Sequence, residues 1–152
     1  MIAKLAHYSV RTAHLEASRR FYTEVLQLRV GFRPPFRFPG LWLYFGDDET
    51  DYGVVHLIGV DPNGPGALHD YFGERPGSDR TGTGSVDHIA FLATDWPRMR
   101  ARCDKNGVGY VQNTVPALGL HQVFIVDPSG VTIELNYPLA EANAPRAQLE
   151  EV

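Results

Sequence analysis

The sequence predicts an α+β fold made of two βαβββ modules, and three observations lead to this prediction. Short β-branched and aromatic runs, typical of strands, alternate with two longer segments whose apolar residues recur at helical spacing. The order strand, helix, strand, strand, strand occurs twice along the chain. Similar residues also recur about 80 positions apart, as Gly40 and Gly119 do at an offset of 79, which indicates an internal duplication.

The first module is expected to open with a strand at 5–11 (LAHYSVR), followed by a helix that ends near Leu26. Thr12 can cap this helix, whose apolar residues recur on one face. After the helix, apolar runs predict strands at 28–32, 41–45 and 53–60.

The second module repeats this order. It is expected to contain a strand at 86–92, a helix at 96–105 that opens at Asp95 and closes at Asn106-Gly107, and a strand at 108–111. A β-hairpin completes the module, in which strands at 123–126 and 131–135 flank the turn Asp127-Pro128-Ser129-Gly130.

Residues 1–138 are expected to form a single domain. The first module covers about 4–60 and the second about 85–138, and the stretch 61–84, rich in Gly, Pro, Asp and Thr, connects them. The Ala-, Glu- and Gln-rich tail 139–152 is expected to be frayed or docked on a partner subunit.

The composition favours a small-molecule partner. A net charge of -4 and a pI near 5.8, without a cluster of basic residues, give no sign of binding to nucleic acid or to anionic membranes. No stretch has the length and apolarity of a membrane span or a signal peptide, so a cytoplasmic location is expected. Cys103 is the only cysteine, which excludes an intrachain disulfide and a thiolate metal cluster.

The duplication places four residues of metal-ligand type at two related positions. His7 aligns with His88 at an offset of 81 residues, and His56 aligns with Glu134 at an offset of 78. Glu134 stands between aliphatic residues, where an ionised carboxylate is costly unless a positive group faces it, although a solvated edge strand is the alternative. Imidazole and carboxylate donors suit Fe, Mn, Ni, Co or Zn, and the sequence does not choose among these metals.

Several motifs together resemble the vicinal oxygen chelate superfamily, which includes glyoxalase I, fosfomycin-resistance proteins, methylmalonyl-CoA epimerase and extradiol dioxygenases. They are LAHYSV with FYTEVLQLRV, VVHLIGV, VDHIAF and VFIVDPSGVTIELNYP, within about residues 4–137. The resemblance implies that the strands of both modules curve into an eight-stranded mixed sheet around one divalent metal ion, held by His7, His56, His88 and Glu134. It also implies a homodimer and chemistry on a small substrate with adjacent oxygens.

The number of protein ligands separates the activities that this resemblance allows. Four ligands leave two open positions on an octahedral ion, which suits lyase or isomerase chemistry on a chelated substrate, and this is the function we expect. Without His56, the residues His7, His88 and Glu134 would form the facial triad of an Fe(II) extradiol ring-cleaving dioxygenase. A metal-free ligand-binding or resistance protein is the third alternative, and the four ligand-type residues argue against it.

No branch of the superfamily matches at every position. His56 stands where glyoxalase I and the epimerase commonly have a carboxylate or amide, and Phe124 stands where extradiol enzymes have a tyrosine. The catalytic residues we expect are Glu134 and His121, because an imidazole can transfer protons near neutral pH. Strand alternation opposes the choice of His121, since His121 and Gln122 cannot both face inward.

Aromatic side chains are candidates for the wall of the substrate pocket, although strand aromatics are more often core residues. The four candidates are Phe36, Trp42, Tyr44 and Phe124.

Overall fold

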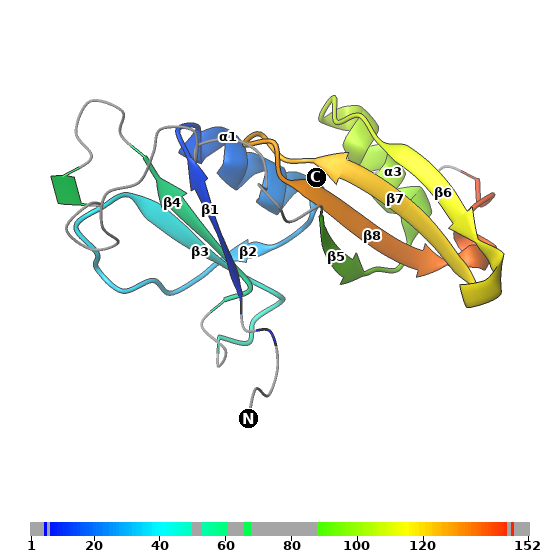
Figure 1. The fold of residues 1–152 in the computed structure, drawn as a ribbon, viewed down its shortest axis with the longest axis horizontal. Helices are drawn as coiled ribbons and strands as arrows, with labels where there is room; N and C mark the ends of the chain where they lie inside the picture. Colours follow the sequence, from blue (N-terminus) through cyan, green and yellow to red (C-terminus); the bar gives the residue numbers. More distant parts are fainter. Residues whose placement is uncertain are drawn as a thin grey trace. The chain divides into compact units, whose positions relative to one another are not determined.

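The computed structural model describes residues 5, 7–49, 53–60, 66–67, 88–145 and 147. The chain divides into two compact units, residues 1–81 and 82–152, and each is described by itself. Each unit contains one four-stranded mixed sheet and one β-α-β-β-β succession (Figure 1), which confirms the α+β class and the doubled order.

The first unit has the sheet order β1-β4-β3-β2. Strand β1 pairs in parallel with β4, while β3 is antiparallel to both β4 and β2. Its elements are β1 (Tyr8–Thr12), α1 (Leu15–Arg20), the π-helical segment η1 (Phe21–Val25), β2 (Arg29–Val30), β3 (Gly40–Tyr44) and β4 (Val55–Gly59).

Thr12 does not cap the first helix, contrary to the expectation. It is the last residue of β1, and its hydroxyl oxygen accepts hydrogen bonds from the backbone N–H of His14 at 2.9 Å and from the hydroxyl of Ser18 at 3.1 Å. The strand runs one residue further than the sequence pattern indicates, so the helix begins two residues later. Thr12 therefore lies outside the helix and links the end of β1 to it through the hydrogen bond from Ser18.

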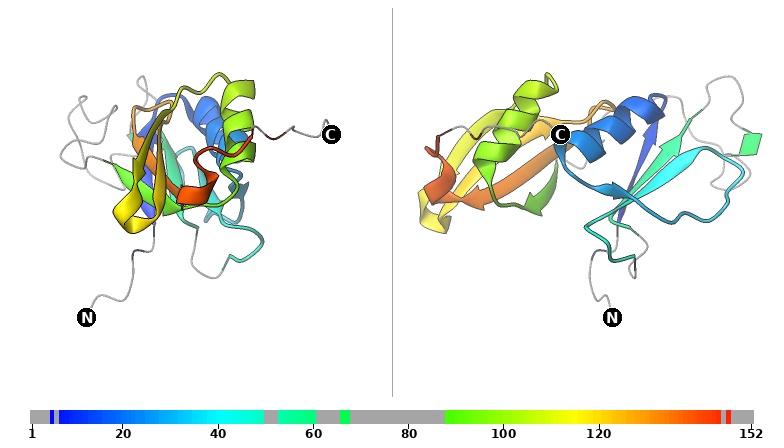
Figure 2. Two further views of the ribbon diagram at one scale, coloured as in Figure 1. Left: turned by 90° about the vertical axis from the view of Figure 1, so that its right-hand side faces the viewer. Right: turned by 180° about the vertical axis from the view of Figure 1, so that it is seen from behind.

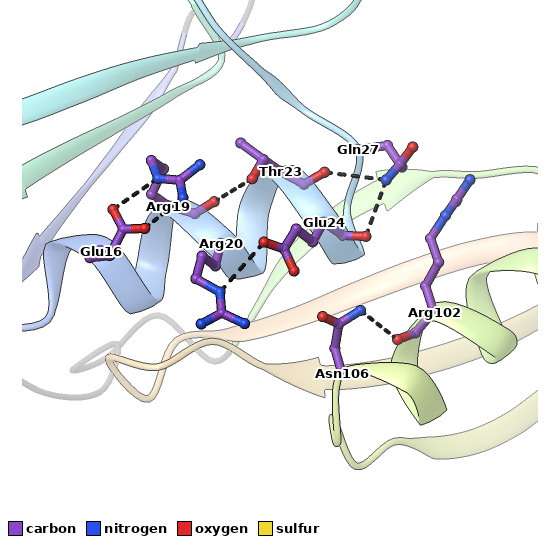
Figure 3. A network of polar contacts seen from close by, with 8 residues as sticks. All are labelled: Glu16, Arg19, Arg20, Thr23, Glu24, Gln27, Arg102 and Asn106. Atoms are coloured by element: carbon purple, nitrogen blue, oxygen red, sulfur yellow. Dashed lines mark hydrogen bonds and ion pairs between the residues drawn. The ribbon is translucent and has the colours of Figure 1, made fainter. Parts of the chain in front are cut away.

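The C-terminal end of this helical segment is capped by the side chain of Gln27 (Figure 3). The backbone of Gln27 has a φ of 59°, a left-handed conformation that ends the helix. Its side-chain amide donates to the carbonyl oxygens of Thr23 and Glu24 at 3.2 and 3.1 Å. These bonds satisfy carbonyl groups that have no partner within the helix.

Opposite faces of the helical segment differ in polarity. The outer face carries the ion pairs Glu16–Arg19 and Arg20–Glu24 (Figure 3), while Phe21, Tyr22 and Val25 are buried. They bury their apolar surface in the core that also contains Leu43, Val55 and Leu57 of the sheet.

The second unit has the sheet order β5-β8-β7-β6, and α3 lies across one face of this sheet (Figure 2). Strand β5 pairs in parallel with β8, and the other pairs are antiparallel. Its elements are β5 (Ile89–Leu92), α3 (Trp96–Lys105), β6 (Val111–Val115), the short 3-10 helix η3 (Pro116–Leu118), β7 (Leu120–Val126), β8 (Thr132–Pro138) and the 3-10 helix η4 (Leu139–Glu141).

Helix α3 has the predicted bounds, whereas β6 begins three residues later than expected. Asp95 caps the helix by accepting from the N–H of Arg98 at 3.3 Å. At the other end, the N–H of Val108 donates to the carbonyl of Cys103 at 2.8 Å. Val108 is thus part of the helix termination, so the strand predicted at 108–111 starts only at Val111.

The beginning of the tail belongs to the second unit. The N–H of Leu139 donates to the carbonyl of Gly119 at 2.8 Å, and a carboxylate oxygen of Glu141 accepts from the N–H of Trp96 at 2.6 Å. Residues 139–141 are therefore held within the second unit and are not frayed. Of the expected connection 61–84, all but Gly66 and Ala67 lies outside the described residues.

Within the part of the chain that the structure describes, no helix has the length and apolar character needed to cross a membrane.

The turn between β7 and β8 is organised by the buried side chain of Asp127. One of its carboxylate oxygens accepts from the N–H groups of Ser129 and Val131, each at 2.8 Å. Gly130 has a φ of 82°, which a residue with a Cβ adopts only with strain. The predicted hairpin is confirmed, and the acidic residue explains its tight geometry.

Replacement of Asp127 tests this account of the hairpin. Asp127→Ala is expected to lower the free energy of unfolding by about 1–3 kcal/mol, because two buried N–H groups lose their acceptor. Asp127→Asn keeps an acceptor oxygen and is expected to recover at least half of that loss. Urea unfolding measures both values, and equal losses in the two variants would contradict the assignment.

Candidate metal centre

The register of the parallel strand pairs places the two candidate ligands of each unit on the same face of its sheet. Ser9 of β1 stands opposite His56 of β4, and Ala90 of β5 stands opposite Glu134 of β8. Side chains of paired residues point to the same face, and residues two apart on a strand do so as well. His7 therefore shares the face of His56, as His88 shares that of Glu134.

This register confirms two of the three alignments in the repeat. His7 lies two residues before Ser9, the partner of His56, and His88 lies two residues before Ala90, the partner of Glu134. His56 and Glu134 therefore occupy equivalent positions on the last strands of their units.

The alignment of Gly40 with Gly119 is wrong. Gly40 pairs with Ile58, and the residue that corresponds to Ile58 in the second unit, Asn136, pairs with Gln122. Gln122 is thus the counterpart of Gly40. Gly119 instead precedes β7 with a φ of 65°, at the end of a 3-10 turn that has no equivalent between β2 and β3 of the first unit.

In the first unit, the ring of His56 lies between two other rings. Its centroid is 3.8 Å from that of His7 with an interplanar angle of 18°, and 4.0 Å from that of Trp42 with an angle of 4°. His56 is buried, with 8% of its surface exposed, whereas His7 is exposed. The stacking fixes the plane of the His56 ring while leaving the edge of the ring, with its nitrogens, outside the stack.

In the second unit, His88 and Glu134 are in direct contact. The Nε2 atom of His88 lies 2.6 Å from Oε2 of Glu134, and the Glu134 side chain is only 8% exposed. No lysine or arginine among the described residues lies within ion-pair distance of this carboxylate. Within the described part of the chain, this buried carboxylate is therefore balanced by one imidazole, whose charge depends on protonation.

A chain of amides holds the other oxygen of Glu134. Gln122 donates from Nε2 to Oε1 of Glu134 at 2.7 Å, and its own oxygen accepts from the side-chain amide of Asn113 at 3.3 Å. Gln122 and Asn113 are not among the site residues expected from the sequence. The signal for Gln122 was present, because it lies two residues before Phe124 on the strand that faces Glu134.

The candidate ligands thus occur as two pairs, one in each unit. Across the described ranges, no group of three or more His, Cys, Asp or Glu side chains is arranged to hold a metal ion. Each pair supplies nitrogen or oxygen donors of the kind that divalent first-row metals accept.

His121 lies on the opposite face of its sheet from Glu134. It stands beside Tyr137 in the register, 5.6 Å between ring centroids from Trp96 of α3, and only 2% of its surface is exposed. Neither ring nitrogen has a hydrogen-bond partner among the described residues. The expected contribution to proton transfer beside Glu134 is not supported, because strand alternation turns His121 toward the helix.

The aromatic residues expected to line a pocket divide into two groups. Trp42 stacks on His56, and the ring of Phe124 lies 5.9 Å from that of His88, edge to face. Phe36 lies further along the same face, with its ring 6.2 Å from that of Trp42.

Tyr44 is instead part of the core. It is 2% exposed, donates from its hydroxyl to the carbonyl of Phe32 at 2.6 Å, and packs where Gly31 has no side chain. Burial raises the pKa of the Tyr44 hydroxyl. The structure therefore does not present Tyr44 as a wall residue.

Comparison with known proteins gives one family and many solved structures. The chain matches the family described as the Glyoxalase/Bleomycin resistance protein/Dioxygenase superfamily over residues 4–135. No curated protein matches its sequence.

The solved structures are similar in fold at low identity. Lactoylglutathione lyase from Agrobacterium tumefaciens is 19% identical, with a TM-score of 0.57 over 90% of this chain and 94% of that chain. A glyoxalase family protein from Bacillus anthracis is 18% identical, with a TM-score of 0.63 over 91% and 97%. The fosfomycin resistance protein FosX from Listeria monocytogenes is 14% identical, with a TM-score of 0.62 over 93% and 99%.

The buried imidazole of His121 predicts an acid-dependent loss of stability. Burial lowers its pKa, while the carboxylate of Glu141 partly opposes this shift. The unfolded chain therefore takes up the proton at a higher pH than the folded chain does. The destabilising effect of the buried His121 imidazole is absent above the unfolded pKa of about 6.5 and grows as the pH falls below it.

His121→Leu is expected to remove this part of the pH dependence. Its free energy of unfolding should fall less between pH 7.5 and pH 5 than that of the unaltered protein, as measured by urea unfolding at both pH values. The same decrease in both proteins would contradict the assignment.

Proposed function

Because the chain belongs to the glyoxalase/bleomycin resistance protein/dioxygenase superfamily, we propose that it is a divalent-metal-dependent enzyme with lyase or isomerase chemistry. The proposed substrate is a small molecule with adjacent oxygen atoms. The proposed ligands are His7, His56, His88 and Glu134. The superfamily also contains resistance proteins, so the proposal rests on the chemistry of these four side chains.

The observation that carries the proposal is the burial of Glu134 beside His88. A carboxylate that is 8% exposed and has no lysine or arginine partner among the described residues is stabilised by any cation that binds to it. A divalent ion would supply the positive charge, and the neutral imidazole of His88 would become a second ligand of the ion. A protein that only enclosed an apolar ligand would have no need of this arrangement.

The first unit supports the same proposal from its equivalent positions. His7 and His56 occupy the positions in the first unit that His88 and Glu134 occupy in the second. Stacking on Trp42 fixes the plane of the His56 ring. The proposal requires that one pair from each unit share one ion, either within one chain or between two copies of it.

A divalent ion bound by these residues would act as a Lewis acid on the adjacent oxygens of the substrate. Glu134 is the proposed proton acceptor, because its carboxylate is buried and lies on the same face as Phe124. Gln122 fixes Oε1 of that carboxylate through a 2.7 Å hydrogen bond. Trp42 and Phe124 provide apolar surface beside the two pairs, which would exclude water from the reacting groups.

Metal content tests the proposal. Protein purified without chelators is expected to carry about one divalent ion per chain, measured by inductively coupled plasma mass spectrometry. His7→Ala and Glu134→Ala are each expected to reduce this content at least about tenfold, because each removes one ligand from a different unit. His14→Ala, at an exposed histidine of the first unit, is the control and should retain the metal.

Two outcomes would contradict the proposal. Undiminished metal in a Glu134→Ala and His88→Ala double variant would show that the ion binds elsewhere. Loss of metal in only one of the two variants His7→Ala and Glu134→Ala would show that the two pairs do not share the ion. His56→Ala separates the alternatives, because retained iron and oxygen consumption with catechol in that variant would favour the dioxygenase.

Gln122 provides a finer prediction. Gln122→Ala is expected to weaken metal binding about tenfold to a hundredfold, because residues that orient a metal ligand have effects of this size. Asn113→Ala removes only the longer 3.3 Å bond to Gln122 and should have a smaller effect. Competition with a chromophoric chelator measures both affinities, and equal effects would contradict an orienting role for Gln122.

A further inference from the structure

A half-buried arginine lies near the first pair of ligands. Arg33 is in the segment between β2 and β3, and its guanidinium carbon is 5.0 Å from the ring centroid of Phe36 and 5.2 Å from that of Phe38. One guanidinium nitrogen donates to the carbonyl oxygen of Phe38 at 2.8 Å. The aromatic rings and this hydrogen bond hold the group in one place.

The sheet leaves room for this guanidinium at Gly40. A Cβ atom at that position would lie 3.1 Å from both Nε and Nη2 of Arg33. Gly40 and Trp42 are two residues apart on β3, so this space lies on the face that carries His56. The ring of Phe36, which contacts both Arg33 and Trp42, continues the surface from the guanidinium toward His56.

The positive charge of Arg33 has no carboxylate partner among the described residues. The guanidinium has five N–H donors in a planar fork, and the carbonyl of Phe38 takes only one of them. Burial also lowers the pKa of the group. A cation that is half removed from water and has donors to spare is a binding site for an anion.

We propose that Arg33 binds a carboxylate group of the substrate, whose apolar part packs against Phe36 and Trp42. This proposal rests on the proposed metal-dependent function, because the rest of the same substrate would reach the candidate metal ligands. It assigns the substrate to the small organic acids. A guanidinium matches a carboxylate through two parallel hydrogen bonds, and the aromatic surface beside it favours an acid with a planar or acyl body.

The alternative is that Arg33 only orders the segment in which it lies. In that case its replacement would lower stability without changing the choice between an acid and its neutral analogue. Arg37 is the matched control, because it lies in the same segment and is exposed.

The experiment compares phenylacetate with phenylacetamide, which differ in charge and little in shape. Their dissociation constants are measured by isothermal titration calorimetry on the full chain as purified, and again after chelation of its metal. Phenylacetate is expected to bind at least about tenfold more tightly than the amide, the factor that one charge-assisted hydrogen bond supplies. Arg33→Gln should abolish the difference, Arg33→Lys should retain part of it, and Arg37→Gln should leave it unchanged.

Four outcomes would overturn the proposal. They are equal binding of the two probes, no binding of phenylacetate, an undiminished preference in Arg33→Gln, and a preference that disappears on chelation, which would assign the carboxylate to the metal. Arg33→Lys keeps the test valid if Arg33→Gln is poorly folded. Because the chelated protein is measured separately, failure of the metal proposal would leave this result intact.

Discussion

Parallel pairing of the first and last strands in each unit is the constraint on which the candidate site depends. The hydrogen bonds between β1 and β4, and those between β5 and β8, set a register in which Ser9 faces His56 and Ala90 faces Glu134. A shift of one residue in either pair would turn a donor to the other face of the sheet. Buried apolar residues on the helix face oppose such a shift, because it would expose them.

The two faces of the second sheet show how one strand can carry both the core and the site. Val123, Ile125 and His121 of β7 point toward α3, while Gln122 and Phe124 lie on the face of Glu134. The carboxylate is expensive to bury, yet it is held by an imidazole on one oxygen and an amide on the other. Its position thus follows from strand alternation, and its proposed role as a metal ligand rests on what can balance its charge.

The sequence was sufficient to predict features that depend on local chemistry. The bounds of α3 follow from Asp95 and the Asn106-Gly107 end, and the hairpin follows from the residues 127–130 between two β-branched runs. The positions of His7 and His88 could be matched because the repeat preserves the spacing around them.

Features that depend on tertiary contacts were not predictable. The start of β6 depends on the bond from Val108 to Cys103, and the end of the first strand depends on contacts of Thr12 with the helix. His121 was chosen for the chemistry of its imidazole, although strand alternation places it opposite Glu134. Gln122 has no chemical signature of its own and is significant only because its amide reaches the carboxylate.

We propose that donors from both units bind one ion, and the number of imidazoles around that ion tests this proposal most directly. X-ray absorption at the edge of the natural metal, on the full chain, counts these ligands from the scattering of the imidazole rings. Three imidazoles are expected in the unaltered protein, and two in His7→Ala that has been reloaded with an excess of the same metal. One imidazole or none in the unaltered protein would contradict the proposal.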